Sequence, residues 1–506
     1  MFGDLWRSLR RGRSERTETH EEEARRRKRK LLRQSLDVET LETREVPAVM
    51  LFAVGNVHDL TLVHNGGNYQ IVQTSNPLNL LASQAAASVS EVKITGVANV
   101  ADELTVNHGP GIVDVPVTFD GGAGGGDELT LTGFSFTTVT HQMTGPGAAT
   151  VDQDGRVVTT IGIERTVDAL PAAARSFQLP ATNDLVTLDT GAASGDGVSR
   201  LSSPNTVPTI DFAAPQQMLT VDGGLGADWF ELKAVDFAGA APQLRLNGGD
   251  GDDTFQVAAG SSLPNTLTLD GGAGLNNAHV EKTHIDDTKG DGLVGTQLHS
   301  LLVTGGSMSG NRGHGIVLDM VSAFAAIDVT CDGNLGGGLL AQHGDTATVV
   351  GGSYSANWGA GLDLMDISRS VELQGVTASG NIKGGVGLRA TNVGSLSDSS
   401  GSYLQNADGG IVVTDVAGDV MLTGTTADDN DADFSGVGDG FAAMSSGGKH
   451  EWPSEGGVGG NAIGGRLTIT GGSFSRTCSP ETHRSAGFTS RASRAAPTCS
   501  RAGNNR

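Results

Sequence analysis

One asparagine returns at a nearly constant interval through the second half of this chain. It stands at Asn311, Asn334, Asn357, Asn381, Asn406 and Asn430, in steps of 23 to 25 residues. A glycine follows four residues after each of the first five. A repeat of this length is too short for paired helices and too long for a simple hairpin. The interval therefore predicts a stack of similar units, each holding little more than short strands and bends.

Two short alternations of apolar residues keep a fixed offset from that asparagine. The first, after the asparagine, is Ile316/Leu318, Leu339/Ala341, Leu362/Leu364, Val386/Leu388 and Ile411/Val413. The second, before it, is Leu301/Val303, Phe324/Ala326, Ala347/Val349, Val371/Leu373, Leu396/Asp398 and Val420/Leu422, and only Asp398 breaks it. Alternation with period two indicates strands with one buried face, and stacked repeats bring equivalent positions into contact. We therefore expect Leu318, Leu364 and Leu388 to share one interior ladder, and the asparagine amides to bond to the next coil at a bend.

This pattern resembles the right-handed parallel β-helix repeat proteins, the superfamily that includes pectate lyases, polygalacturonases and many non-catalytic surface proteins. The resemblance covers residues 281–475 and implies an all-β fold, a β-solenoid with about 23–25 residues per coil. A segment rich in glycine and serine, residues 435–465, is expected to form a loop that leaves the solenoid. The resemblance is specific for fold and uninformative for function, because the same solenoid carries enzymes and inert scaffolds.

Residues 47–280 indicate β-strand repeats of irregular length, separated by glycine-rich turns. Glycine pairs open at Gly223, Gly248 and Gly271, in steps of 25 and 23 residues. These turns already keep the period of the second half, so we expect the first half to lead directly into the β-helix. Between residues 134 and 215 several prolines interrupt short apolar runs, and the sequence predicts strands there without a topology.

Two of these turns carry a complete Gly-Gly-x-Gly-x-Asp-x-apolar-x motif, at residues 223–231 and 248–256. The motif resembles the RTX, haemolysin-type calcium repeat, in which glycine carbonyls and the Asp carboxylate bind calcium between neighbouring turns. The resemblance implies a calcium site, and stacking at the coil period would crowd its candidate ligands Asp222, Asp228, Asp250, Asp252 and Asp253 on one edge. The alternative is that these are tight turns whose acidic residues simply face water.

Composition and charge narrow the function classes. The chain has 75 glycines among 506 residues and only 4% aromatic residues, which favours a narrow, turn-rich all-β core. Its three cysteines provide no disulfide framework. Residues 47–475 hold 15 basic and 46 acidic residues, a surface that repels nucleic acid and anionic membranes. Apolar runs such as residues 48–54 are far shorter than a transmembrane segment, so none is expected.

The two ends of the chain differ from the body. Residues 1–46 are highly charged and are expected to be an unpacked leader, and residues 476–506 lose the alternation and are expected to be an aberrant, unpacked tail, either truncated or out of frame. The phrase Leu41-Glu42-x-Arg44-Glu45-x-Pro47-Ala48 resembles the amino-terminal leader of many very large bacterial cell-surface and secreted proteins. That resemblance implies export, and hence an extracellular or cell-surface location.

These features together favour an exported, non-catalytic structural or adhesive surface protein, with calcium-stabilised repeats and with cell-surface glycans or other surface proteins as partners. The alternative is a carbohydrate-active β-helix enzyme, a polysaccharide lyase or hydrolase. A paired-carboxylate glycosidase needs two acids about 5–9 Å apart. His343, Asp366 and Arg389 form only a loose acid/base group by position. The acidic run from Asp428 to Asp439 indicates either a solvated loop or a second cation site.

Overall fold

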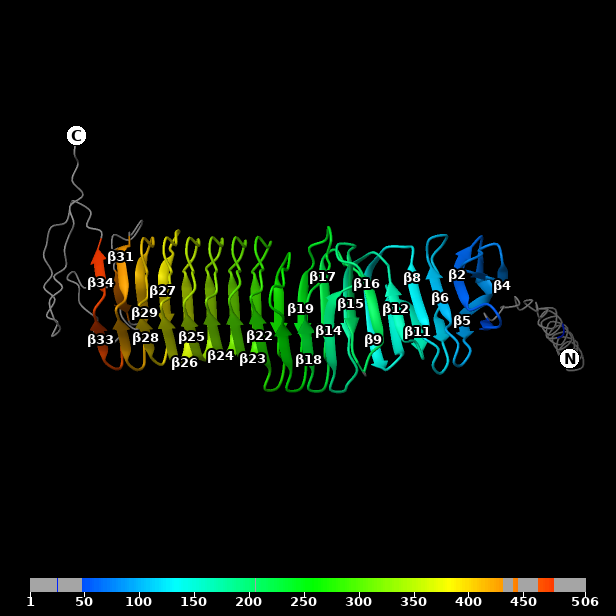
Figure 1. Cartoon of the computed structure of the whole chain (residues 1–506), viewed down its shortest axis with the longest axis horizontal. Helices are drawn as coiled ribbons and strands as arrows, with labels where there is room; N and C mark the ends of the chain where they lie inside the picture. The colour runs from blue at the N-terminus through cyan, green and yellow to red at the C-terminus, as the bar shows by residue number, and fades with distance from the viewer. Residues whose placement is uncertain (1–24, 26–47, 205, 431–439, 445–462, 477–506) are drawn as a thin grey trace, which may run out of the picture. The chain divides into compact units, whose positions relative to one another are not determined.

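The computed structural model divides the chain into two compact units, residues 1–48 and residues 49–506. It describes residue 25 and residues 48–204, 206–430, 440–444 and 463–476. Nearly all of the expected leader and of the expected tail lie outside these residues. Within the unit 49–506, strand follows strand along one axis (Figure 1).

The unit begins with a small antiparallel meander that passes into parallel pairing. Strand β2 pairs with β3, and β3 with β4, in antiparallel fashion, whereas β2, β6 and β8 pair in parallel, as do β5 and β7. The elements are β1 (Ala48–Ala53), β2 (Asp59–Asn65), β3 (Asn68–Gln73), β4 (Leu80–Ala85), the 3-10 helix η1 (Ala86–Ser88), β5 (Val89–Thr95), β6 (Glu103–Asn107), β7 (Val117–Asp120) and β8 (Glu128–Thr132).

Two antiparallel insertions explain why residues 134–215 show no period. The strands are β9 (Phe136–Gly145), β10 (Ala148–Gln153), β11 (Arg156–Ile161), β12 (Arg165–Asp168), β13 (Ala172–Gln178), β14 (Leu185–Thr190), β15 (Val198–Ser202) and β16 (Thr209–Ala213). Strands β9, β10 and β11 pair in antiparallel fashion, as do β14, β15 and β16. The outer strands of each set continue in parallel, β11 with β7, β9 with β13, β16 with β12 and β14 with β18. The ladders therefore continue across both insertions.

From residue 218 onward, strands of successive repeats pair in parallel. The elements are β17 (Met218–Asp222), β18 (Trp229–Leu232), β19 (Gln243–Asn247), β20 (Thr254–Val257), β21 (Leu267–Asp270), β22 (Asn277–Glu281), β23 (Leu293–Thr304), β24 (Ile316–Ile327), β25 (Leu339–Val350), β26 (Leu362–Gln374), β27 (Val386–Thr391), β28 (Leu396–Ser399), β29 (Gly409–Thr414), β30 (Val420–Thr423), β31 (Thr426–Asn430), β32 (Phe441–Met444), β33 (Leu467–Thr470) and β34 (Ser473–Arg476). Both β21 and β22 pair with β23, so the register crosses residue 280 without a break.

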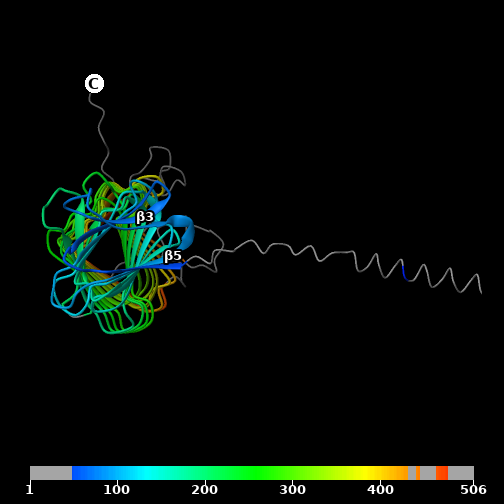
Figure 2. The same ribbon diagram turned by 90° about the vertical axis from the view of Figure 1, so that its right-hand side faces the viewer.

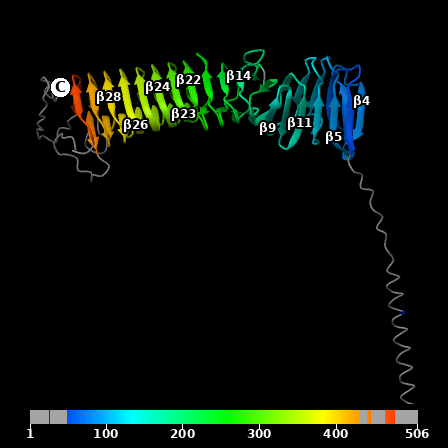
Figure 3. The same cartoon turned by 90° about the horizontal axis from the view of Figure 1, so that it is seen from below.

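The strands of each repeat surround a common interior, as the view along the axis shows (Figure 2). Strands β22, β23, β24, β26 and β28 lie side by side in a third view (Figure 3). A third, shorter ladder of single bridges joins Ser262, His284, Ser307, Thr330, Ser353, Thr377, Ser402 and Thr426. The result is an all-β unit with a mostly parallel, nearly closed sheet, compatible with a β-solenoid. Among the described residues, no helix is long and apolar enough to cross a membrane.

The interior ladders agree with the sequence pattern except at one repeat. The second alternation is confirmed, because Leu301, Phe324 and Ala347 pair in register and are buried. In the first alternation, the prediction for Leu388 is wrong. This residue is buried, but it pairs with Leu362 and therefore belongs to the ladder next to that of Leu364. The cause is two extra residues between Asn381 and its strand, which shift the register by one inward position.

The recurring asparagine forms the predicted buried ladder. All six asparagines are fully buried, and the Oδ1 atom of each accepts a hydrogen bond from a backbone N–H of the preceding coil, at 2.8–3.0 Å. The Nδ2 atom of Asn357 donates to the carbonyl oxygen of Cys331 at 3.0 Å, and that of Asn334 donates to Met308 at 3.1 Å. Both ends of the amide are thus bonded where no water reaches.

The strand β32 corrects the expectation of a loop at 435–465. Phe441 pairs in parallel with Ile411, so part of this segment returns to the sheet. Residues 431–439 and 445–462 lie outside the described part. After this segment the sheet continues in β33, in which Leu467 pairs with Val420 and Ile469 with Leu422.

A layer of buried charge lies where two apolar core clusters meet. One cluster runs from Met50 to Ala172 and the other from Met143 to Ala427. At their junction His141 Nε2 lies 2.8 Å from Asp168 Oδ2, and Arg175 lies 3.0 Å from the same oxygen, with all three side chains at most 1% exposed. His141 contacts Phe177 of the second cluster, whereas Arg175 also donates to the carbonyl of Leu170 in the first.

Candidate functional site

The motif aspartates Asp228 and Asp253 point into the unit and take the place that asparagine holds farther along. Asp228 Oδ1 accepts a hydrogen bond from the backbone N–H of Asp184 at 2.8 Å, and Asp253 Oδ1 accepts one from Asp228 at 2.8 Å. The next rung is Asn276, whose Oδ1 accepts from the N–H of Asp253 at 2.7 Å. The carboxylates thus continue the ladder that the asparagines form.

The other three predicted calcium ligands lie nearer the surface. Asp250 and Asp252 are exposed, and Asp222 is partly buried. Asp222 accepts a hydrogen bond from Asn247 Nδ2 at 3.0 Å, and Asp252 accepts one from the N–H of Leu275 at 2.8 Å. Within the described residues, no group of three or more His, Cys, Asp or Glu side chains has an arrangement that could hold a metal ion.

The motif glycines have a structural reason that needs no ion. A Cβ atom on Gly223 would lie 2.3 Å from Asp228 Oδ2 and 2.4 Å from the carbonyl oxygen of Gly248. Gly251 has a φ of +144°, and a Cβ there would lie 1.7 Å from the carbonyl oxygen of Gly226. Any side chain at these positions would collide with the ladder acid or with the next coil.

The inward acids carry one unsatisfied oxygen each. The Oδ2 atoms of Asp228 and Asp253 are buried and have no hydrogen-bond partner, and the same is true of Asp127 in an earlier turn. Burial raises the pKa of all three carboxyls, and for Asp228, to which Asp184 and Asp253 add their negative charge, the pKa rises to about 7. Either a proton or a cation would satisfy these oxygens.

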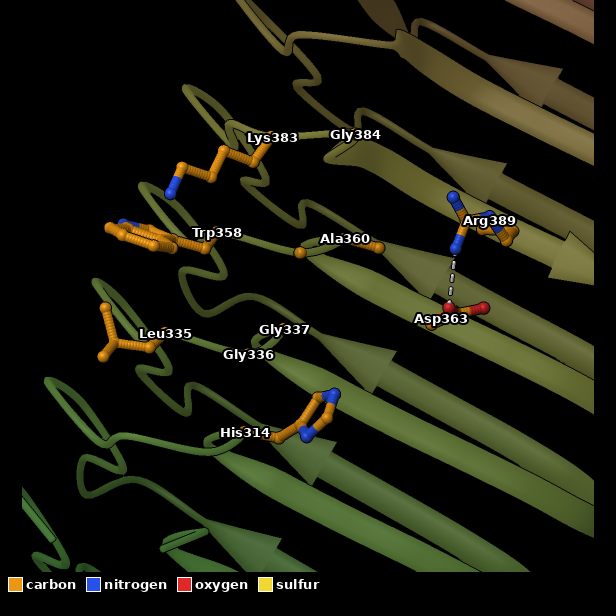
Figure 4. A pocket seen from close by; sticks show the side chains of 11 residues that line it. His314, Leu335, Gly336, Gly337, Trp358, Ala360, Asp363, Lys383, Gly384 and Arg389 are labelled. Carbon is orange, nitrogen blue, oxygen red and sulfur yellow. Dashed lines mark hydrogen bonds and ion pairs between the residues drawn. The ribbon is translucent and has the colours of Figure 1, made fainter. Parts of the chain in front are cut away.

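A shallow groove of about 420 Å³ crosses four successive repeats on the outer surface (Figure 4). One side carries Leu335 and Trp358, which are 47% and 40% exposed, and the ammonium of Lys383 lies 3.3 Å from the centre of the indole ring. On the opposite side, an Arg389 guanidinium nitrogen donates to Asp363 Oδ2 at 2.9 Å. We call this feature the Trp358 groove.

The remaining lining of the Trp358 groove is small or polar. Its floor consists mainly of the backbone of Gly336, Gly337, Gly359, Ala360 and Gly384. His314 closes one end, and its backbone N–H donates to Asp291 at 2.6 Å. Asp363 Oδ1 is buried and has no hydrogen-bond partner. The groove therefore offers a flat aromatic surface and a fixed ion pair.

The loose acid/base group is brought together only in part. His343 Nδ1 lies 2.8 Å from Asp319 Oδ1, and His343 Nε2 lies 3.6 Å from Asp366 Oδ2. The hydrogen bond to Asp319 raises the pKa of this exposed imidazole. Arg389 is not part of this group, because it pairs with Asp363. Of the acidic run, Asp428 and Asp429 lie in β31, and the acids at 431, 433 and 439 lie outside the described residues.

No family model, curated protein or solved structure matches this chain. The site therefore rests on geometry alone. Sequence reasoning identified the motif aspartates but missed the Trp358 groove. One signal for the groove is present in the sequence: Leu335, Trp358 and Ile382 each follow a ladder asparagine directly, and each is exposed although apolar.

Proposed function

We propose that this protein is an exported, non-catalytic structural and adhesive element of the cell surface, built as a right-handed parallel β-helix. The observation that carries the proposal is the continuity of the parallel ladders from β17 to β33. Such stacking gives a stiff rod with a long, regular surface, and each repeat contacts mainly its neighbours. A rod of this kind suits a spacer or a binding platform.

The outward polar side chains support a scaffold rather than an enzyme. Many of them bond from one repeat to the next, as Arg245 does with Asp270, Ser368 with Asp345, and Asn392 with Asp366. Side chains committed to neighbours in this way stabilise the stack and are less available for proton transfer to a substrate. A carbohydrate-active enzyme is the second candidate, supported by the array of Asp319, His343 and Asp366.

Calcium remains part of the proposal as a ligand of the glycine turns. The unsatisfied Oδ2 atoms of Asp228 and Asp253 are the feature that supports it, since carboxylate oxygens are ligands that calcium prefers. The exposed acids Asp250 and Asp252 belong to the same turn and would be the outer ligands. A bound ion would stabilise the folded unit by RT ln(1 + [L]/Kd), where [L] is the concentration of free calcium.

The experiment that tests the surface role uses the full chain in cells of the organism that carries it. Protease added to intact cells should degrade the protein, and a strain lacking the gene should adhere less to surfaces while growing normally. A purified chain that degrades polysaccharides would favour the enzyme instead, and His343→Ala should then abolish that activity. Full protection of the chain in intact cells would contradict the surface role.

A further inference from the structure

The Trp358 groove extends across the strands, from one repeat to the next. Its lining comes from four successive repeats, through His314, Leu335, Trp358 and Lys383 (Figure 4). Because strands of neighbouring repeats lie roughly 4.8 Å apart, four repeats span about 14 Å. A ligand that fills the groove is therefore elongated, and it lies along the axis rather than along a strand.

The two sides of the groove match a molecule with flat apolar faces and polar edges. The exposed indole of Trp358 offers an aromatic surface, and Leu335 extends it by one repeat. The ion pair of Asp363 and Arg389 fixes donors and an acceptor on the other side, where the Arg389 side chain is 37% exposed and that of Asp363 is 19% exposed. Sugar rings have this character, since their C–H faces pack on aromatic rings and their hydroxyls both donate and accept.

The floor of the groove favours a saccharide over a peptide. An extended peptide binds a sheet through free backbone groups at a strand edge. Here the backbone is already bonded between repeats, because Gly336 donates to Gly313 at 2.7 Å and Gly359 donates to Gly336 at 2.7 Å. Arg389 is paired with Asp363, and the carboxylate of Asp408 lies beside Gly384, next in sequence to Lys383, so the cationic lining has acidic side chains close by. This balance favours a neutral ligand over an anionic one.

We propose that the Trp358 groove binds a neutral oligosaccharide, with a ring packed on Trp358 and its hydroxyls bonded to the exposed part of the ion pair of Asp363 and Arg389. This inference rests on the adhesive role proposed above and names the ligand class through which that role is exerted. Lys383 lies over one face of the indole ring, so a sugar ring either takes the other face or displaces the ammonium.

Affinity electrophoresis of the full chain tests the proposal. Native gels would contain soluble β-glucan, galactomannan or xylan as neutral probes, or polygalacturonate as an anionic probe. At least one neutral polysaccharide should retard the protein, and Trp358→Ala should weaken that binding by about tenfold or more. Trp229→Ala is the matched control, because Trp229 is 44% exposed but lies in β18, outside the groove.

A second variant protects the test against misfolding. Asp363→Asn keeps the shape of the side chain but weakens the pair with Arg389, and it should also reduce retardation while circular dichroism stays unchanged. Retardation by none of the neutral probes would overturn the proposal, and so would equal retardation of Trp358→Ala and wild type. Binding of polygalacturonate alone, or of an extended peptide in a Trp358-dependent way, would overturn it as well.

The outcome is separable from that of the surface role. A chain that is degraded on intact cells but is retarded by no neutral polysaccharide would retain its surface role and lose this ligand. A chain that is protected inside cells but shows Trp358-dependent retardation would keep the saccharide site and lose the adhesive role.

Discussion

The substitution Asp228→Asn tests the role of this buried acid. Asp228 Oδ1 accepts the same backbone hydrogen bond that an asparagine Oδ1 accepts elsewhere in the ladder, and Asn276 is an amide two coils farther along it. The substitution keeps the size and shape of the side chain, replaces one carboxyl oxygen by an NH2 group and removes the ability to ionise. We expect it to stabilise the folded protein at neutral and alkaline pH, although it changes a residue of a calcium-type motif.

The magnitude follows from the pKa of Asp228, which burial raises from 3.8 to about 7. Below pH 3.8 the carboxyl is protonated in both folded and unfolded chains, so its ionisation does not lower the free energy of unfolding. As the pH rises toward about 7, the unfolded chain releases the proton while the folded chain retains it, so stability falls. Above about pH 7 the loss is complete. The difference between the pKa values of the unfolded and folded chains corresponds to about 4 kcal/mol of free energy of unfolding. The amide of the Asp228→Asn variant does not ionise, so the variant would avoid this loss.

Urea unfolding at pH 4, 6 and 8, in the presence of a chelator, measures the difference. The free energy of unfolding of Asp228→Asn should equal that of wild type near pH 4 and exceed it by up to about 4 kcal/mol at pH 8. Asp250→Asn, an exposed acid of the same turn region, serves as the control and should change little at any pH.

Two results would refute this reasoning. The first is a variant that is less stable than wild type at pH 8 in chelator, and the second is a difference that does not vary with pH. Millimolar calcium provides a separate comparison. If Asp228 binds calcium, the ion should stabilise wild type but not the variant. The difference between their free energies of unfolding at pH 8 should then become smaller or change sign.

Four further substitutions, at three positions, test the ladders and one turn by urea unfolding at pH 7, with Asn357→Asp measured at low and high pH as well. Leu364→Ala should cost about 2–5 kcal/mol because Leu364 is fully buried between repeats; a change below about 1 kcal/mol would contradict the interior placement. Asn357→Ala should cost about 2–5 kcal/mol, since it leaves the N–H of Asn334 and the carbonyl of Cys331 unpaired, whereas Asn357→Asp should be milder at low pH than at high pH. Gly251→Ala should prevent stable folding of the turn, because its Cβ would lie 1.7 Å from a backbone oxygen; normal stability of this variant would mean that the turn is placed wrongly.

The sequence predicted those parts of the fold that repeat. Asn311 and its five successors could be found because every coil needs the same amide at the same bend, and the aliphatic ladders followed from them. Leu388 was assigned to the wrong rung because two extra residues in one turn shift the register without disturbing the alternation. The strands β10 and β15 could not be found by period, since each is an antiparallel insertion into a parallel ladder.

Of the two candidate sites, the one in a repeated motif could be predicted from the sequence and the other could not. Asp228 and Asp253 were conspicuous because they belong to a repeated motif, but whether such a side chain points inward or outward depends on the turn conformation and not on the motif. The Trp358 groove consists of residues that do not repeat, and its floor is backbone. Only the three-dimensional stack brings Asp363 and Arg389 opposite Trp358.

The charged layer at His141, Asp168 and Arg175 affects how the stack of repeats unfolds. In a linear array each unit is held mainly by its neighbours, so cooperativity extends only as far as the contacts between neighbours are strong. The apolar core is continuous on either side of this layer. Across it the parallel ladders continue, but the side-chain contacts include ions whose desolvation offsets much of their attraction. Under a pulling force or in denaturant we expect this junction to be the weakest point of the stack, so that one segment can unfold as a block while the other stays folded and the chain extends in steps.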